Sequence, residues 1–511
     1  MHEKINAKNS VSIYHQIFVS IDRLLINRWK RACNNCGGAG RCNRTKVSTT
    51  RGTPSPSIDL KEAVREKIPL HYDLLRKLRS QHGSTVISRI TIDDIYEGLK
   101  GVNTLVRETC EADSTFGLRY RGLTLSEVLA LLPRHSNAPS PEAVFWLLLT
   151  GDVPTYEQTA SLVEDWNLRR QRQKKWWLQS GDGSFVGRIF KAFPKYVTPL
   201  TKLSVVLSAF NATEKGLNEI GTTRNMSYDS WEKTYEEGME LLAILPGMVG
   251  LTRDADRGIE AGFMKFDEKR ADWVDFLLEN SGLLSNTIDD RKKASFGDFL
   301  RLYIVANADE DGGIPSTHVT QILGASRLEL SKTLAAGVLA YSNEPNTGTM
   351  SQYMDFQKKI QNVLGHRPSG EALKDLVSTL FVKESEIIGH KETPISDSRY
   401  AAFSDFAREN MNEEPDIKLS RDITRILTAI ANSSGKNLWP EQSAIAAPIF
   451  QLYGLKNMEF NQTLLWMSRA LGTVASIIWT RATDIPPEHP KSQSTYTYVN
   501  LFENSRKNAK P

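Results

Sequence analysis

Cysteine is scarce in this chain, and three of its four cysteines lie before residue 43. Only Cys110 follows, so residues 57–511 cannot form an internal disulfide. Cys33 and Cys36 form a CxxC pair of the kind that opens zinc sites, and Cys42 lies six residues further on. Because no fourth ligand lies nearby, we predict no metal site.

Long apolar runs are also missing. The best candidate for a membrane span, "TLLWMSRALGTVASIIW", is interrupted by Arg469 and predicts a buried helix instead. Strand signals are few and short, the clearest being "STVISRITI" at residues 84–92. No internal repeat is present, so repeat architectures are excluded.

The net charge of +4 comes from one end of the chain. The first 56 residues hold ten Lys and Arg against two acidic residues, a balance of +8, which leaves 4 − 8 = −4 for the rest. The charge therefore gives no reason to expect nucleic-acid binding. This basic segment, with a possible amphipathic helix, is typical of a mitochondrial transit peptide over residues 1–56. A disordered cytosolic tail is the alternative.

From Ile58 onwards the pattern is mostly helical. Apolar residues recur at steps of three and four from Leu60, and Gly83 is a plausible stop, with Pro69 as a possible kink or break. "SPEAVFWLLLTG" predicts another helix, with Ser140 as N-cap and Gly151 as C-cap. Helices that are apolar on more than one face predict an all-α fold, a multilayer bundle.

Composition also suggests two domains. The chain is more polar between about residues 341 and 434. We predict a large domain from residues 57–345 and 449–511, with a small helical domain at 346–448. The cleft between them would be the ligand site.

Four stretches resemble animal-type mitochondrial citrate synthase: "LRSQHGSTVISRITIDDIYEGLKGVNTLVRETCEADSTFGLRYRG", "SPEAVFWLLLTGDVPTYEQ", "RLYIVANADEDGG" and "MSRALGTVASIIWTRATDIPPEHPKSQST". The resemblance runs from about Leu60 to about Phe502. It implies an all-α homodimer of the mitochondrial matrix, whose two domains close over oxaloacetate and acetyl-CoA, with no bound cofactor and no membrane span.

The catalytic positions of the family are altered. Citrate formation requires a carboxylate to remove a methyl proton, a histidine for the enolate and another for the ketone. The carboxylate belongs to a Trp-Pro-Asn-Val-Asp-Ala-His segment, which aligns on "WPEQSAI" and places Ser443 at the base. The first histidine position holds Glu344, and the second histidine persists as His390.

The substrate positions are altered in part. Arg399 and Arg469 match arginines that bind the oxaloacetate carboxylates. Glu310 stands in place of a substrate-binding histidine, His489 in place of a third arginine, and Pro394 in place of an arginine at the CoA phosphates. A glutamate about 4 Å from a dianion would repel it by on the order of 4 kcal/mol.

Each of these residues also has a structural interpretation. His390 next to a glycine is more often structural than catalytic once its partners are missing. Arg469 in an apolar helix is expected to be buried and paired, and Arg399 with Asp397 to cap a turn. Glu310 and Glu344 are candidates for simple solvation.

Two functional hypotheses follow. The first is a catalytically impaired or inactive paralogue that acts as a binding or regulatory protein, as a homodimer or bound to an active citrate synthase. The second is an active citrate synthase or related acyl-CoA condensing enzyme, with acetyl-CoA as co-substrate and Glu344 as a displaced base. A substrate other than oxaloacetate would account for His489 and Pro394 together.

Overall fold

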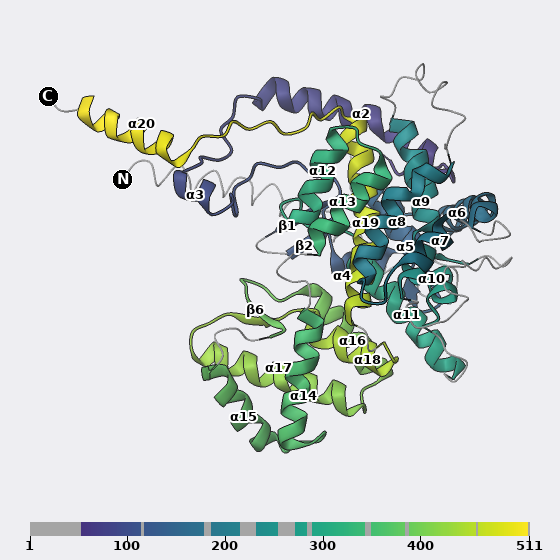
Figure 1. Cartoon of the computed structure of the whole chain (residues 1–511), viewed down its shortest axis with the longest axis vertical. Coiled ribbons are helices and arrows are strands. Elements are labelled where there is room, and N and C mark those ends of the chain that lie inside the picture. The colour runs from purple at the N-terminus through teal and green to yellow at the C-terminus, as the bar shows by residue number, and fades with distance from the viewer. Residues whose placement is uncertain are drawn as a thin grey trace, which may run out of the picture. The chain divides into compact units, whose positions relative to one another are not determined.

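Helices dominate the computed structural model (Figure 1), which describes residues 53–113, 117–177, 185–214, 231–253, 271–283, 289–342, 349–383, 388–455 and 458–508. Residues 48–511 form one compact unit of the chain. The proposed transit peptide, except residues 53–56, lies outside the described residues, as do Cys33, Cys36, Cys42 and Glu344.

The first half of this unit contains the helices α2 Leu60–His82, α3 Ile92–Tyr96, α4 Leu125–Leu131, α5 Pro141–Thr150, α6 Tyr156–Trp177, α7 Phe185–Ala192, α8 Pro199–Glu214, α9 Trp231–Thr252 and α10 Trp273–Ser281. The second half contains α11 Asp290–Ala306, α12 Pro315–Ala325, α13 Leu330–Tyr341, α14 Thr349–Leu364, α15 Gly370–Lys383, α16 Ser398–Asn410, α17 Pro415–Ser433, α18 Ser443–Leu452, α19 Met458–Ala482 and α20 Thr495–Asn508.

The predicted helix boundaries are confirmed at α2 and α5. The Asp59 side chain caps the start of α2. The helix ends at His82, directly before the expected stop at Gly83, and Pro69 does not divide it. In α5 every residue is buried, and Gly151 ends it in the left-handed conformation, with φ 75°. That conformation favours glycine because it lacks a Cβ atom.

The strand prediction for residues 84–92 is wrong. Val86 and Ile87 are exposed, and the segment has no strand partner among the described residues. Thr91 and Asp94 form a capping box, which starts α3 at the end of the predicted strand. Local β-branched composition does not make a strand where no neighbour completes the ladder.

The described strands form three small antiparallel sheets. They are β1 Cys110–Asp113, β2 Gly117–Tyr120 and β3 Leu123–Thr124 in one sheet, β4 Arg134–His135 with β5 Ala138–Pro139, and β6 His390–Glu392 with β7 Leu438–Pro440. In the last sheet His390 is paired with Pro440 and Lys391 with Trp439. These short strands leave the all-α fold class intact.

The core is centred on α19, which packs against α5, α8, α9, α11 and α12. Helices α14 to α18 form a group in which α18 contacts α14, α16 and α17, and α15 contacts α17 (Figure 1). This group corresponds in sequence to the predicted small domain, whose separation from the rest stays a prediction. None of the described helices combines the length and apolarity that a membrane crossing requires.

Candidate functional site

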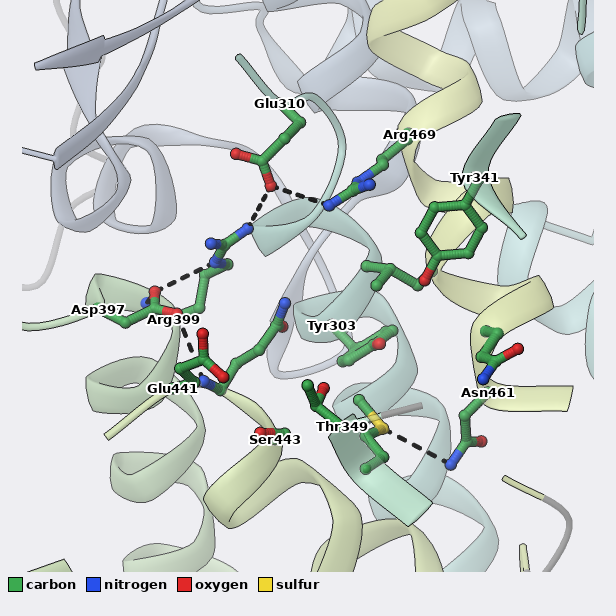
Figure 2. A pocket seen from close by; sticks show the side chains of 14 residues that line it. Tyr303, Glu310, Tyr341, Thr349, Asp397, Arg399, Glu441, Ser443, Asn461 and Arg469 are labelled. Atoms are coloured by element: carbon green, nitrogen blue, oxygen red, sulfur yellow. Dashed lines mark hydrogen bonds and ion pairs between the residues drawn. The ribbon is translucent and has the colours of Figure 1, made fainter. Parts of the chain in front are cut away.

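A cavity of about 80 Å³ lies where the end of α11 and its following loop meet α13, α14, α16, α18 and α19 (Figure 2). Five of its lining side chains are charged. The lining residues are Tyr303, Glu310, Tyr341, Thr349, Met350, Asp397, Arg399, Glu441, Gln442, Ser443, Asn461, Gln462, Leu465 and Arg469.

Glu310 ties the two predicted substrate arginines together. Its Oε2 accepts hydrogen bonds from Arg399 Nη1 at 2.8 Å and from Arg469 Nη2 at 3.0 Å (Figure 2). All three side chains are largely buried, at 14% exposure for Glu310, 18% for Arg399 and 11% for Arg469. Glu310 is therefore ion-paired rather than simply solvated, and Arg469 is paired as expected.

Electrostatics fixes the charges of this cluster. Burial alone would raise the pKa of Glu310, but the guanidinium groups of Arg399 and Arg469 outweigh burial and lower that pKa to about 2. Burial would lower the pKa of Arg399, but Asp397 and Glu310 raise it well above its usual value. Glu310 and Arg399 are thus both ionised at neutral pH.

Asp309 fixes the loop that carries Glu310. The buried Asp309 carboxylate forms an ion pair with Arg107, and its Oδ1 accepts the Glu310 backbone N–H at 2.9 Å. Helix α19 approaches this loop at Gly472, where a Cβ atom would overlap the Asp309 side chain. This close approach brings Arg469, one turn earlier on α19, to Glu310.

A second set of bonds fixes the start of α16 and α18. Asp397 accepts the backbone N–H of Arg399 at 2.9 Å as the N-cap of α16, and its side chain also accepts the Arg399 Nε–H at 3.1 Å. The other Asp397 oxygen lies 3.3 Å from the Gln442 backbone N, which donates to it. Gln442 and Asn307 exchange two amide hydrogen bonds at 2.9 and 3.0 Å.

Ser443, at the predicted position of the base, lines the cavity at 2% exposure. Its hydroxyl has no hydrogen-bond partner among the described residues. No base therefore activates it there, and a serine hydroxyl alone cannot remove a proton from a thioester methyl group.

Glu441 is a lining carboxylate that the sequence analysis did not single out. Burial and the nearby Asp397 raise its pKa, while Lys391 and Arg399 act in the opposite direction. The signal was available, because the resemblance aligns Glu441 with the asparagine two residues before the predicted position of the base.

His390 is not among the residues that line this cavity. It lies on β6, buried, with Nδ1 at 3.3 Å from the Ile388 carbonyl oxygen and Nε2 without a partner among the described residues. Burial lowers its pKa to about 4, so the imidazole is neutral at physiological pH. The preceding Gly389 has φ 76°, and a Cβ atom there would overlap the Tyr353 ring.

Two of the remaining predicted positions, Pro394 and His489, lie elsewhere. Both are exposed and do not line the cavity. Glu344 is outside the described residues. The structure thus brings together Glu310, Arg399, Arg469 and Ser443, but not the CoA-side position or the third arginine position.

Solved structures of the same fold include citrate synthase from Pyrobaculum aerophilum, at a TM-score of 0.62 and 18% identity over 78% of this chain and 92% of that one. A ternary complex of carboxymethyl coenzyme A and oxaloacetate with citrate synthase from Thermoplasma acidophilum matches at a TM-score of 0.59 and 14% identity, over 78% of this chain and 94% of that one. At these identities the likeness shows the fold alone, which is the citrate synthase fold.

Proteins of similar sequence show to which family this chain belongs. The model of the citrate synthase C-terminal domain matches residues 98–491. A protein named "Probable citrate synthase, mitochondrial" from Caenorhabditis elegans is 30% identical over 455 residues, which cover 87% of this chain and 92% of the relative. "Citrate synthase, mitochondrial" from Aspergillus niger is 30% identical over 452 residues, covering 85% and 89%. The chain belongs to the citrate synthase family.

Proposed function

We propose that this protein is a non-catalytic member of the citrate synthase family that acts as a binding or regulatory protein in the mitochondrial matrix. The observation that carries the proposal is the position of Glu310, whose carboxylate engages both Arg399 and Arg469. These are the two arginines that, by resemblance, bind the carboxylates of oxaloacetate. An internal carboxylate therefore occupies the groups that the substrate needs.

The catalytic groups support the same proposal. Ser443 takes the place of the base and has no described partner that could activate it. His390 is neutral but lies outside the cavity lining. One acid or base group contributes roughly 10²–10⁴ in rate, and groups that act as a unit lose most of their effect when any one is missing.

A second candidate function is an active acyl-CoA condensing enzyme with a displaced base. The observation that favours it is the Glu441 carboxylate, which lines the cavity and has a raised pKa. A carboxylate in that state is a better proton acceptor near neutral pH than an ordinary one. The predicted alternative base, Glu344, provides no such argument because it lies outside the described residues.

A thiol-release assay with the purified full chain, acetyl-CoA and oxaloacetate separates these candidates. We expect no CoA release above the rate without protein, because the base is absent and the arginines are engaged. Steady release that is abolished in Glu441→Gln or Glu344→Gln, but not in Glu392→Gln, would overturn the proposal in favour of a displaced base. Glu392 is an exposed glutamate on β6 and serves as the matched control.

We also propose that a second subunit covers two exposed apolar segments, so that the protein is a dimer. Val86 and Ile87 are 76% and 75% exposed before α3, and Tyr496 and Phe502 on α20 are 82% and 52% exposed. Tyr96 and Thr495 share a 2.7 Å hydrogen bond, which joins the two segments. Exposed apolar side chains that lie together on a surface favour association with another protein surface.

Analytical ultracentrifugation of the full chain tests the association. We expect a dimer for the native protein and a monomer for Ile87→Asp combined with Phe502→Asp. Val363→Asp, at a residue 67% exposed on α14, is the control and should remain dimeric. A native protein that is monomeric at every concentration contradicts the proposal. Native mass spectrometry after mixing with an active citrate synthase distinguishes a homodimer from a heterodimer.

A further inference from the structure

The charges that line the cavity no longer suit a dianion. The lining carries the carboxylates of Glu310, Asp397 and Glu441 against the guanidinium groups of Arg399 and Arg469, a formal balance of 2 − 3 = −1. Glu310 pairs with both arginines, and Asp397 pairs with Arg399. Within the described part of the chain, Glu441 is the one carboxylate of the lining that forms no ion pair.

Two hydroxyl groups in the same lining also lack partners. Ser443 is 2% exposed and Tyr303 is fully buried, and neither side-chain oxygen has a hydrogen-bond partner among the described residues. Buried polar groups are normally hydrogen-bonded, since their desolvation is otherwise uncompensated. Glu441, Ser443 and Tyr303 all line this cavity (Figure 2). A hydroxyl can donate or accept, whereas the Glu441 carboxylate only accepts, so a ligand that donates hydrogen bonds would suit all three groups.

We infer that the cavity binds a small organic monocation with a primary amine, whose ammonium group pairs with Glu441 and donates hydrogen bonds to Ser443 or Tyr303. An ammonium group is a donor without an acceptor, which matches a carboxylate and two hydroxyl oxygens. This inference rests on the proposed function, because it requires that oxaloacetate no longer takes the site.

The surroundings of Glu441 are compatible with a cation. Arg399 is neutralised by Glu310 and Asp397, so it does not present an unpaired charge to the ligand. Lys391 is exposed and forms no ion pair with Glu441 in the described part of the chain, but its charge lowers the pKa of Glu441. Asp397 raises the pKa of Glu441, although its own charge is balanced by Arg399. The cavity of about 80 Å³ restricts the ligand to a few non-hydrogen atoms.

Three probes of nearly equal size test this inference: ethanolamine hydrochloride, ethylene glycol and sodium glycolate. Each is titrated into the full-length protein at constant ionic strength, with thermal shift and isothermal titration calorimetry as readouts. We expect saturable stabilisation by ethanolamine, and none by ethylene glycol or glycolate. Glu441→Gln should weaken ethanolamine binding by about tenfold or more, as expected for a lost charge-assisted hydrogen bond.

Glu392→Gln is the matched control and should bind ethanolamine as the native protein does. Saturation-transfer difference NMR on the native protein provides a readout that does not depend on any variant folding. Absence of ethanolamine binding overturns the inference but leaves the proposed function intact if CoA release is also absent. Binding of glycolate in preference to ethanolamine overturns the inference, and CoA release from oxaloacetate overturns the proposed function itself.

Discussion

We expect Glu310→Gln to lower the free energy of unfolding by about 3 kcal/mol at neutral pH. The reason is that the pKa of Glu310 is lowered from 4.5 to about 2 in the folded protein, so folding favours its ionised form. Glutamine keeps the shape of the side chain but leaves two buried guanidinium groups without their common carboxylate. Chemical denaturation of the native protein and the variant at pH 7 measures the difference.

The pH dependence of that difference identifies its cause. Because the folded pKa is lowered, the stabilisation is fully present above about pH 4.5 and is lost as the pH falls towards 2. The native protein and Glu310→Gln should therefore converge in acid. Glu329→Gln, which removes an exposed ion pair with Lys332, is the control and should cost at most about 1 kcal/mol. A pH-independent loss for Glu310→Gln would mean that packing, not charge, is responsible.

Helices were the most predictable part of this fold. The three- and four-residue spacing of α2 and the caps of α5 are local signals, and both helices have the predicted bounds. The strand predicted at residues 84–92 failed for a non-local reason, since a strand exists only where a neighbour accepts its hydrogen bonds. The pairing of His390 with Pro440 is likewise set by tertiary structure and has no local signal.

The site was predictable as a set of positions but not as a set of contacts. Glu310, Arg399, Arg469 and Ser443 were each identified by aligning them with the family, and they line one cavity. Sequence alone suggested either that Glu310 repels the substrate or that it is simply solvated. Its pairing with both arginines depends on the approach of α19 at Gly472, which no pattern in the sequence encodes.

The charge of Glu310 therefore acts in a different way from simple repulsion. A carboxylate that already neutralises Arg399 and Arg469 competes with an incoming carboxylate for the same donors. Bidentate guanidinium contacts are the main way in which proteins fix a dicarboxylate. A ligand must first displace Glu310, and this displacement costs the free energy that the ion pairs contribute. Arg399 and Arg469 are present in this site, but both already form ion pairs with Glu310.

Removal of the internal carboxylate should consequently restore dicarboxylate binding. We expect Glu310→Ala to bind L-malate on the order of 100-fold more tightly than the native protein, because about 3 kcal/mol of competition corresponds to roughly that factor. Isothermal titration calorimetry and the thermal shift with L-malate measure it. Glu329→Ala should leave the affinity unchanged, and Glu310→Ala combined with Arg469→Met should lose the gain.

Comparing the L-malate affinity of the native protein with that of Glu310→Ala decides whether Glu310 blocks the two arginines. If L-malate binds the native chain as tightly as Glu310→Ala, then Glu310 does not block the arginines. If neither the native protein nor Glu310→Ala binds L-malate, although Glu310→Ala is folded, then Arg399 and Arg469 do not form a dicarboxylate site. A gain confined to Glu310→Ala would show that a single side chain, placed where the resemblance predicts a histidine, separates this site from one that accepts a dicarboxylate. CoA release by Glu310→Ala should still be absent, because Ser443 remains without a base.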